Sequence, residues 1–258
     1  MTGTIDFRIS ELEAMKRYPE TLYYRGSTGL LESRKVSIVG TRRPGAYTKS
    51  AVQQLAAALS KRGVTVVSGA AMGVDALAHR GAGAERTIAV LGCGLDHRYP
   101  AVNASLIEEI EKRGLVLSQF EPDFRATPWS FVVRNELVVA LGEVLIVGEA
   151  DRGSGTMRSV EYALKMGKSI YVLPHRLGES EGTTDLLKEG AAEAIYDIEE
   201  FASRFATGAE KSEEADDFTA FCKSSPTYEE AVKRFGDRVF EAELEGMIAV
   251  QDGRIIPL

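Results

Sequence analysis

The chain contains few of the residues that build disulfide frameworks, metal sites and acid–base catalytic centres. Its 258 residues include two cysteines, three histidines and one tryptophan. Cys93 and Cys222 lie far apart without metal-ligand spacing, which favours a reducing cytosol. The histidines, His79, His97 and His175, are scattered, and His79 is expected to pack against the core from a helix. We therefore predict no catalytic residues, no metal site and no enzyme activity.

Long apolar runs are also missing. No run approaches the roughly 18 residues that cross a bilayer. Residues 1–20 carry acidic side chains and lack the apolar stretch of a signal peptide. The sequence therefore predicts a cytoplasmic protein without a membrane partner.

Positive charge is in deficit over the whole chain, at a net charge of −7, but it is unevenly distributed. Residues 1–50 hold nine lysines and arginines against five acidic residues, whereas residues 210–258 hold six against twelve. Segregated charge of this kind is compatible with nucleic-acid binding by one part of the chain. We expect the two ends to face different kinds of partner.

Glycine, in contrast, is abundant, and it follows four short apolar runs. The runs and the loops after them are 36–39 with 40–45, 64–67 with 68–73, 88–91 with 92–96, and 144–147 with 148–156. A strand followed by a glycine turn and a helix is how open parallel sheets bind phosphate, because helix N-termini offer free N–H groups. Four such loops predict an extended phosphate-binding rim.

Alternating strand and helix patterns over residues 36–206 predict an α/β fold with a Rossmann-like, doubly wound, mostly parallel sheet. Residues 1–35 are interpreted as a short N-terminal extension. The polar, acidic segment 207–217 is typical of a linker. Residues 218–258 show three helices and then a hairpin turning at Asp252-Gly253, which is the order of a small winged-helix-like domain.

The third helix of that C-terminal domain, predicted over 238–245, carries several acidic residues, which would repel phosphate. We therefore predict that the domain contacts protein rather than DNA, with Phe240 and Leu244 packed inside.

The glycine loops do not match the common nucleotide-binding fingerprints. Residues 40–45 lack Gly-x-Gly-x-x-Gly, and no Walker lysine follows a glycine loop, so we expect no dinucleotide cofactor and no P-loop nucleotide. Arg42 and Arg43 suit phosphate, although they are also compatible with a solvated turn, and only one of them is expected to face the crevice.

Other polar residues leave two interpretations open. Ser68 and Ser154 suit either a phosphate or simple helix capping. Arg134-Asn135 interrupts an apolar helix and needs a buried partner, which is a carboxylate such as that of Glu136, a carbonyl or a phosphate. Aromatic stacking on bases would use Phe124, Trp129 or Phe131, which are equally compatible with the core.

Five ordered motifs make residues 20–200 resemble the DNA processing protein A family (DprA, also called Smf). They are Gly40-Thr41-Arg42, the run from Ser68 through Asp75 to His79, the run from Leu91 through Tyr99-Pro100 to Asn103, Arg134-Asn135, and Glu149-Ala150 with Ser154-Gly155-Thr156. Three positions depart from the family pattern, namely Glu136, His175 and Thr184.

The resemblance implies a protein that binds single-stranded DNA, dimerises through its Rossmann-like domain, protects incoming DNA and loads the RecA recombinase during natural transformation. It also implies the nucleic-acid-binding residues Gly40, Thr41, Arg42, Arg43, Ser68, Gly69, Arg134, Asn135, Gly153, Ser154, Gly155 and Thr156. Glu136 replaces a usual arginine and weakens the positive field there.

One enzyme class stays open as an alternative. Arg152-Gly153-Ser154-Gly155-Thr156 followed by Glu161 partly resembles the motif of nucleoside-monophosphate phosphoribohydrolases of the lysine-decarboxylase-like family. The catalytic arginine–glutamate pairing of that family has no clear counterpart in this chain.

Overall fold

The computed structural model describes residues 2–206, 217–222, 224–236, 238–244, 248–251 and 253–257. The chain separates into two compact units, Met1–Thr207 and Gly208–Leu258. The predicted linker, apart from Asp217, and Asp252 of the predicted hairpin turn lie outside the described residues. None of the helices in the described part of the chain combines the length and apolarity that crossing a membrane requires.

A nine-stranded sheet in the order β1-β2-β6-β5-β4-β3-β7-β8-β9 forms the centre of the first unit. Its strands are β1 (Gly3–Thr4), β2 (Tyr23–Gly26), β3 (Lys35–Val39), β4 (Thr65–Ser68), β5 (Thr87–Val90), β6 (Leu115–Ser118), β7 (Leu145–Val147), β8 (Ile170–Val172) and β9 (Glu193–Ala194). The strands from β3 to β9 are parallel, and β1 and β2 add an antiparallel edge. The prediction of a mostly parallel α/β sheet is confirmed.

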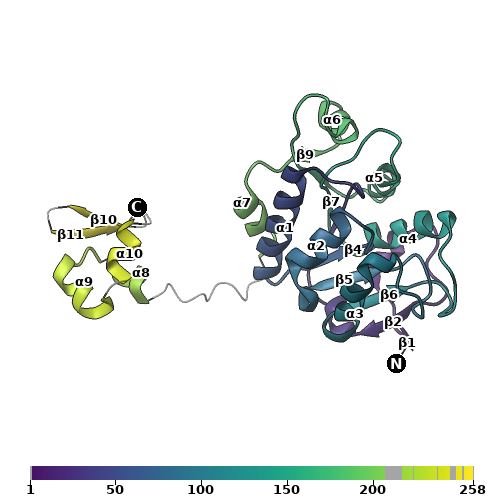
Figure 1. Cartoon of the computed structure of the whole chain (residues 1–258), viewed down its shortest axis with the longest axis horizontal. Coiled ribbons are helices and arrows are strands. Elements are labelled where there is room, and N and C mark those ends of the chain that lie inside the picture. The colour runs from purple at the N-terminus through teal and green to yellow at the C-terminus, as the bar shows by residue number, and fades with distance from the viewer. Residues whose placement is uncertain are drawn as a thin grey trace. The chain divides into compact units, whose positions relative to one another are not determined.

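Helices cover both faces of this sheet, so the unit has three layers (Figure 1). They are α1 (Ala46–Lys61), α2 (Val74–Ala82), α3 (Ala104–Arg113), α4 (Pro128–Leu141), α5 (Gly155–Lys165), α6 (Glu181–Lys188) and α7 (Ile198–Ser203). Short 3-10 turns lie at Ser10–Ala14, Thr28–Leu31, Ala84–Arg86 and Ala101–Asn103. Because side chains alternate along a strand, β3 packs Val36 and Ile38 against α1 and α2, whereas Val39 joins the core under α4 and α5.

The strand order reverses at β3, which makes this strand the switch point of the sheet. Strands β4 to β6 follow on one side of β3, and β7 to β9 on the other. The loops after β3 and β7 therefore meet: Thr41 N donates to Glu149 O at 2.8 Å, and Gly45 N donates to a Glu149 carboxylate oxygen at 3.0 Å. Open α/β sheets bind ligands in the crevice at such a point.

The described residues of the predicted N-terminal extension form part of the main sheet. They supply β1 and β2, and β2 pairs with β6 from Tyr23↔Ser118 to Gly26↔Leu115. The turn at Ser10–Ala14 places Leu12 in the core with no exposed surface. The extension therefore widens the sheet at the edge away from the switch point.

The second unit has its own apolar core. Its elements are α8 (Asp217–Cys222), α9 (Tyr228–Phe235), α10 (Arg238–Leu244), β10 (Ile248–Gln251) and β11 (Arg254–Pro257), and the two strands form an antiparallel hairpin. The core residues are Phe218, Cys222, Ala231, Val239, Ala242, Ile248 and Ile255.

The prediction that Phe240 packs inside this unit is wrong, because its side chain is 59% exposed. The buried face of α10 is shifted by one residue, to Val239 and Ala242, which lie one helical turn apart. Glu241 and Glu243 are exposed, as expected, and the side chain of Leu244 lies outside the described residues.

Candidate nucleic-acid interface

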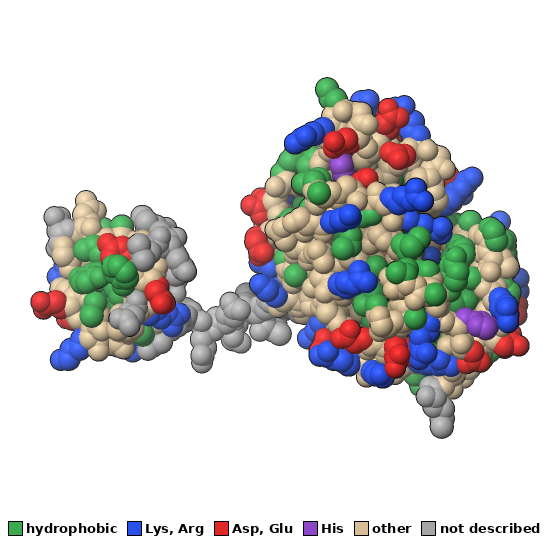
Figure 2. Space-filling model, viewed as in Figure 1, with side chains coloured by type: hydrophobic (Ala, Val, Ile, Leu, Met, Phe, Trp, Pro, Cys, Tyr) green, Lys and Arg blue, Asp and Glu red, His purple; other side chains and the backbone are tan. Residues whose placement is uncertain are grey.

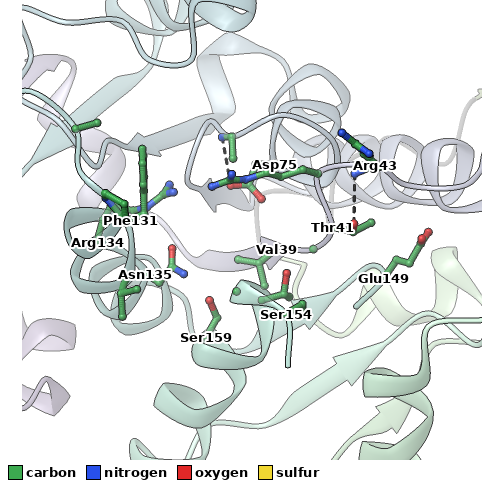
Figure 3. Close-up of a pocket in the computed structure, with 18 of the residues that line it drawn as sticks. Val39, Thr41, Arg43, Asp75, Phe131, Arg134, Asn135, Glu149, Ser154 and Ser159 are labelled. Atoms are coloured by element: carbon green, nitrogen blue, oxygen red, sulfur yellow. Dashed lines mark hydrogen bonds between the residues drawn. The ribbon is translucent and has the colours of Figure 1, made fainter. Parts of the chain in front are cut away.

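A cavity of about 870 Å³ opens at the switch point, and we call it the switch-point cavity. Its lining residues are Val39, Gly40, Thr41, Arg42, Arg43, Ala71, Asp75, Tyr99, Ala126, Thr127, Pro128, Phe131, Val132, Arg134, Asn135, Glu149, Asp151, Ser154, Gly155, Thr156 and Ser159. In Figure 3, Phe131, Arg134 and Asn135 of α4 lie on one side, and Thr41 and Arg43 lie on the other. Of the predicted site residues, Ser68, Gly69 and Gly153 are not among the lining residues.

Arg42 and Arg43 both line the cavity and both are exposed. The expectation that only one of the two guanidinium groups faces the crevice stays a prediction. Within the described residues, neither guanidinium forms an ion pair with a carboxylate, so both positive charges remain accessible to a ligand. The guanidinium carbon of Arg42 lies 5.8 Å from the ring centre of Phe131.

Ser154 stands directly before α5, and its hydroxyl is not used for capping. The helix begins at Gly155 without a side-chain cap hydrogen bond. The Ser154 Oγ is buried, and it has no hydrogen-bond partner within the described part of the chain. Since buried polar atoms in folded proteins are nearly always paired, this hydroxyl indicates a binding position at the N-terminus of α5.

Arg134 projects from α4 beneath the cavity and is only 4% exposed. Its Nη1 donates to Val90 O at 3.0 Å, while its Nε has no hydrogen-bond partner among the residues that the structure describes. Gly69 makes room for it, because a Cβ there would lie 1.4 Å from Arg134 Nη1. Glu136 is not the partner of Arg134: its carboxylate accepts a hydrogen bond from Lys16 N at 2.8 Å.

Asp75 of α2 balances the buried Arg134 charge. The carboxylate accepts hydrogen bonds from Gly69 N at 3.2 Å and Ala71 N at 3.4 Å. Burial raises the pKa of Asp75 and lowers the pKa of Arg134, and the opposite charge of each partner works against both shifts. Asp75 thus holds the 69–71 loop in place beside the cavity.

The second and third glycine loops have packing roles in the structure, and their part in a phosphate rim stays a prediction. The Ser68 hydroxyl is fully buried and donates to Ile38 O at 2.6 Å, so it ties β4 to β3. A Cβ at Gly92 would lie 2.6 Å from the Phe131 ring, so Gly92 admits this side chain just as Gly69 admits Arg134. The loops after β3 and β7 thus supply most of the glycine-loop residues that line the cavity, together with Ala71 of the second loop, and Gly69 and Gly92 make room for α4.

Two aromatic rings flank the cavity. Phe131 lines it, and Tyr99, which is 50% exposed, lies 5.4 Å away between ring centres at an angle of 35°. Phe124 instead stacks on Phe120, and the exposed Trp129 lies outside the cavity lining. Tyr99 was missed as a stacking residue because it lies far from α4 in the sequence. It belongs to the family motif that runs from Leu91 to Asn103. Figure 2 shows basic and hydrophobic side chains side by side on this unit.

Acidic side chains also line the cavity, but two of them are already engaged. Asp75 holds the 69–71 loop, and Glu149 accepts from Gly45 N and from Thr48 Oγ1. Asp151 is exposed at the rim. Among the described residues, no group of three or more His, Cys, Asp or Glu side chains is placed to hold a metal ion.

The open, mostly parallel α/β sheet with a cavity at its switch point defines a protein of Rossmann-like architecture. Residues 8–206 match the family described as DNA recombination-mediator protein A, and the chain belongs to this family.

Individual relatives agree with this assignment. DNA processing protein DprA of Bacillus subtilis is 33% identical over 70% of this chain and 63% of its own length. The solved structure of DNA processing protein A from Helicobacter pylori, described for its single-stranded DNA binding mode, superposes with a TM-score of 0.77 at 42% identity, covering 79% of this chain and 95% of that one. The Streptococcus pneumoniae DprA structure gives 0.73 at 30% identity, covering 80% and 75%. The chain thus spans less than two thirds of the Bacillus protein.

Proposed function

We propose that this chain binds single-stranded DNA in the switch-point cavity. Arg42 and Arg43 contact phosphates from one wall, and the N–H groups of Gly155 and Thr156 contact a phosphate from the other. The Phe131 and Tyr99 rings stack on a base that lies between these two walls. The cavity reads no base edge in this arrangement, so binding is largely independent of sequence.

The observation that carries the proposal is a pair of buried polar atoms without partners beside two accessible arginines. Ser154 and Arg134 both line the cavity, and within the described residues the buried Ser154 Oγ and Arg134 Nε have no hydrogen-bond partner. A phosphate oxygen accepts hydrogen bonds from both kinds of group, whereas a cation would be repelled by the arginines. The family's description as a DNA recombination mediator supports the same ligand, and so does the single-stranded DNA binding mode of the Helicobacter protein.

We assign the chain the role of a non-enzymatic cytoplasmic mediator, which protects incoming DNA and loads RecA during natural transformation. It acts as a homodimer through its first unit, and the winged-helix-like C-terminal unit contacts protein. The family description as a recombination mediator supports this role. Exposed Glu241 and Glu243 on α10 support a protein partner over DNA, because they would repel phosphate.

The test compares wild type with Arg42→Ala by fluorescence anisotropy on labelled oligo-dT and on duplex DNA at two salt concentrations. Wild type should prefer the single strand. Arg42→Ala should lose about tenfold in affinity, or ~1.4 kcal/mol, and the slope of log K against log salt should fall by about 0.7.

Arg158→Ala is the matched control, because Arg158 is exposed on α5 outside the cavity lining and pairs with Glu161. It removes the same charge without removing a proposed contact. Unchanged affinity in Arg42→Ala would contradict the site. Release of adenine from adenosine monophosphate by the wild-type chain would contradict the non-enzymatic role.

A further inference from the structure

A second cavity of about 770 Å³ lies next to the switch-point cavity, and we call it the Tyr47 cavity. Its lining residues are Gly45, Ala46, Tyr47, Thr48, Glu149, Pro174, His175, Arg176 and Glu179. It is formed by the first turn of α1 and the segment after β8. Glu149 lines both cavities, and the loop after β3 runs from Arg43 in the first to Gly45 in the second.

The polar groups on the floor of the Tyr47 cavity satisfy one another. The Glu149 carboxylate accepts from Gly45 N at 3.0 Å and from Thr48 Oγ1 at 2.5 Å. The Nε2 of His175 lies 3.0 Å from the same Thr48 hydroxyl, and its Nδ1 lies 2.9 Å from Leu173 O. The carboxylate therefore already occupies the anion position at the N-terminus of α1.

This floor excludes a phosphate from the Tyr47 cavity. An entering anion would meet the Glu149 carboxylate at the helix end, and Glu179 adds a second negative charge to the lining. Arg176 is the single permanently charged cation in the lining. A neutral, planar ligand therefore fits this lining better than an anion does.

Tyr47 supplies the surface for such a ligand. Its side chain is 51% exposed, although it stands beside a cavity and on the first turn of a rigid helix. The neighbouring His175 ring packs against it in a T-shaped pair, with the ring centres 5.5 Å apart and the planes at 86°. An aromatic ring presented in this way is typical of a stacking platform for a nucleobase.

We propose that the Tyr47 cavity is a second base subsite for the DNA strand held in the switch-point cavity. A phosphate stays on Arg43, at the loop between the two cavities, and a neighbouring base turns into the second cavity and stacks on Tyr47. The strand therefore crosses the sheet edge from the α4 and α5 side towards α1. This inference rests on the proposed function.

The experiment measures affinity for a series of oligo-dT lengths with wild type, Tyr47→Leu and Tyr47→Phe. Tyr47→Leu should weaken binding about tenfold for oligonucleotides long enough to span both cavities and leave the shortest binders unchanged. Tyr47→Phe should bind like wild type at every length, because it keeps the ring. Tyr196→Leu is the matched control, since Tyr196 is 86% exposed and outside both cavities.

Arg42→Ala, measured in parallel, separates the two proposals. If Arg42→Ala weakens all lengths while Tyr47→Leu matches wild type at every length, the second subsite is wrong and the first stands. If Tyr47→Leu weakens short and long strands equally, the two cavities do not act as successive subsites. If Arg42→Ala binds like wild type, the proposed function itself fails.

Discussion

The effect of Ser154→Ala on the free energy of unfolding tells whether the Ser154 hydroxyl is a binding group or a structural one. Its hydroxyl is buried without a partner, so Ser154→Ala should leave the free energy of unfolding unchanged or raise it by up to about 1 kcal/mol. The same change should weaken oligo-dT binding roughly fivefold, because a hydrogen bond to phosphate is lost. Urea titration and fluorescence anisotropy measure the two effects.

Ser37→Ala is the matched control for that prediction. Ser37 is fully buried, its hydroxyl donates to Val138 O at 2.6 Å, and it is not among the lining residues of the cavity. This variant should lose about 1 kcal/mol of stability and keep its affinity. A stability loss in Ser154→Ala as large as that in Ser37→Ala would mean that the Ser154 hydroxyl is a structural group.

His79 makes the stability of the first unit dependent on pH. Burial lowers its pKa from 6.5 to about 3, and the charges of Arg134 and Arg80 act in the same direction. The Thr87 hydroxyl donates to Val66 O, so it accepts from the His79 Nδ1, and the buried Nε2 has no partner for a second proton. The unfolded chain therefore binds a proton below pH 6.5 that the folded chain does not.

The stability contributed by neutral His79 is thus present above pH 6.5 and is lost as the pH falls towards 3, at up to ~1.4 kcal/mol per pH unit from this group. Urea titrations at pH 7, 6 and 5 measure the slope. His79→Asn keeps a donor for Thr87 and should remove this contribution. An identical slope in wild type and His79→Asn would contradict the assignment.

At the scale of elements, the packing of α4 depends on glycines in loops that are distant from it in the sequence. Gly69→Ala would place a methyl group 1.4 Å from Arg134 Nη1, so the guanidinium would have to leave Val90 O. Displacing a buried charge from its partners should cost about 3 kcal/mol or more. Thermal or urea unfolding measures this loss.

Gly155→Ala is the control for this substitution, because no atom lies within 4 Å of the added Cβ and the residue opens a helix. It should change stability by less than about 0.5 kcal/mol. In an Arg134→Met background, Gly69→Ala should cost much less, since the clashing group is gone. Additive losses in the double variant would contradict the contact.

The same glycines show what the sequence could and could not predict. The strands β3, β4, β5 and β7 were predicted to within about one residue, because buried apolar runs bounded by glycine are local signals. β1 and β9 span two residues each and carry no periodic pattern, so they were missed. The loops containing Gly69 and Gly92 were assigned to phosphate, because close approach by α4 depends on tertiary packing that no local pattern records.

At the scale of the whole molecule, the two units differ in the chemistry of their surfaces. The first unit holds the switch-point cavity with its accessible arginines, and it has its own apolar cores. The second unit is built on a separate core and exposes Phe240 beside acidic residues on α10. An exposed aromatic ring among acidic side chains is typical of a protein contact and unsuited to phosphate.

A chain ending at residue 206 should therefore bind oligo-dT within about twofold of the full chain, with the same salt slope, because each phosphate contact contributes about 0.7 to that slope and none is removed. Anisotropy at two salt concentrations measures both quantities. Glu241→Gln in the full chain is a second measurement, and it should leave affinity unchanged since α10 does not approach the strand. A loss of slope of 0.7 or more on truncation, or tighter binding by Glu241→Gln, would place the second unit on the DNA.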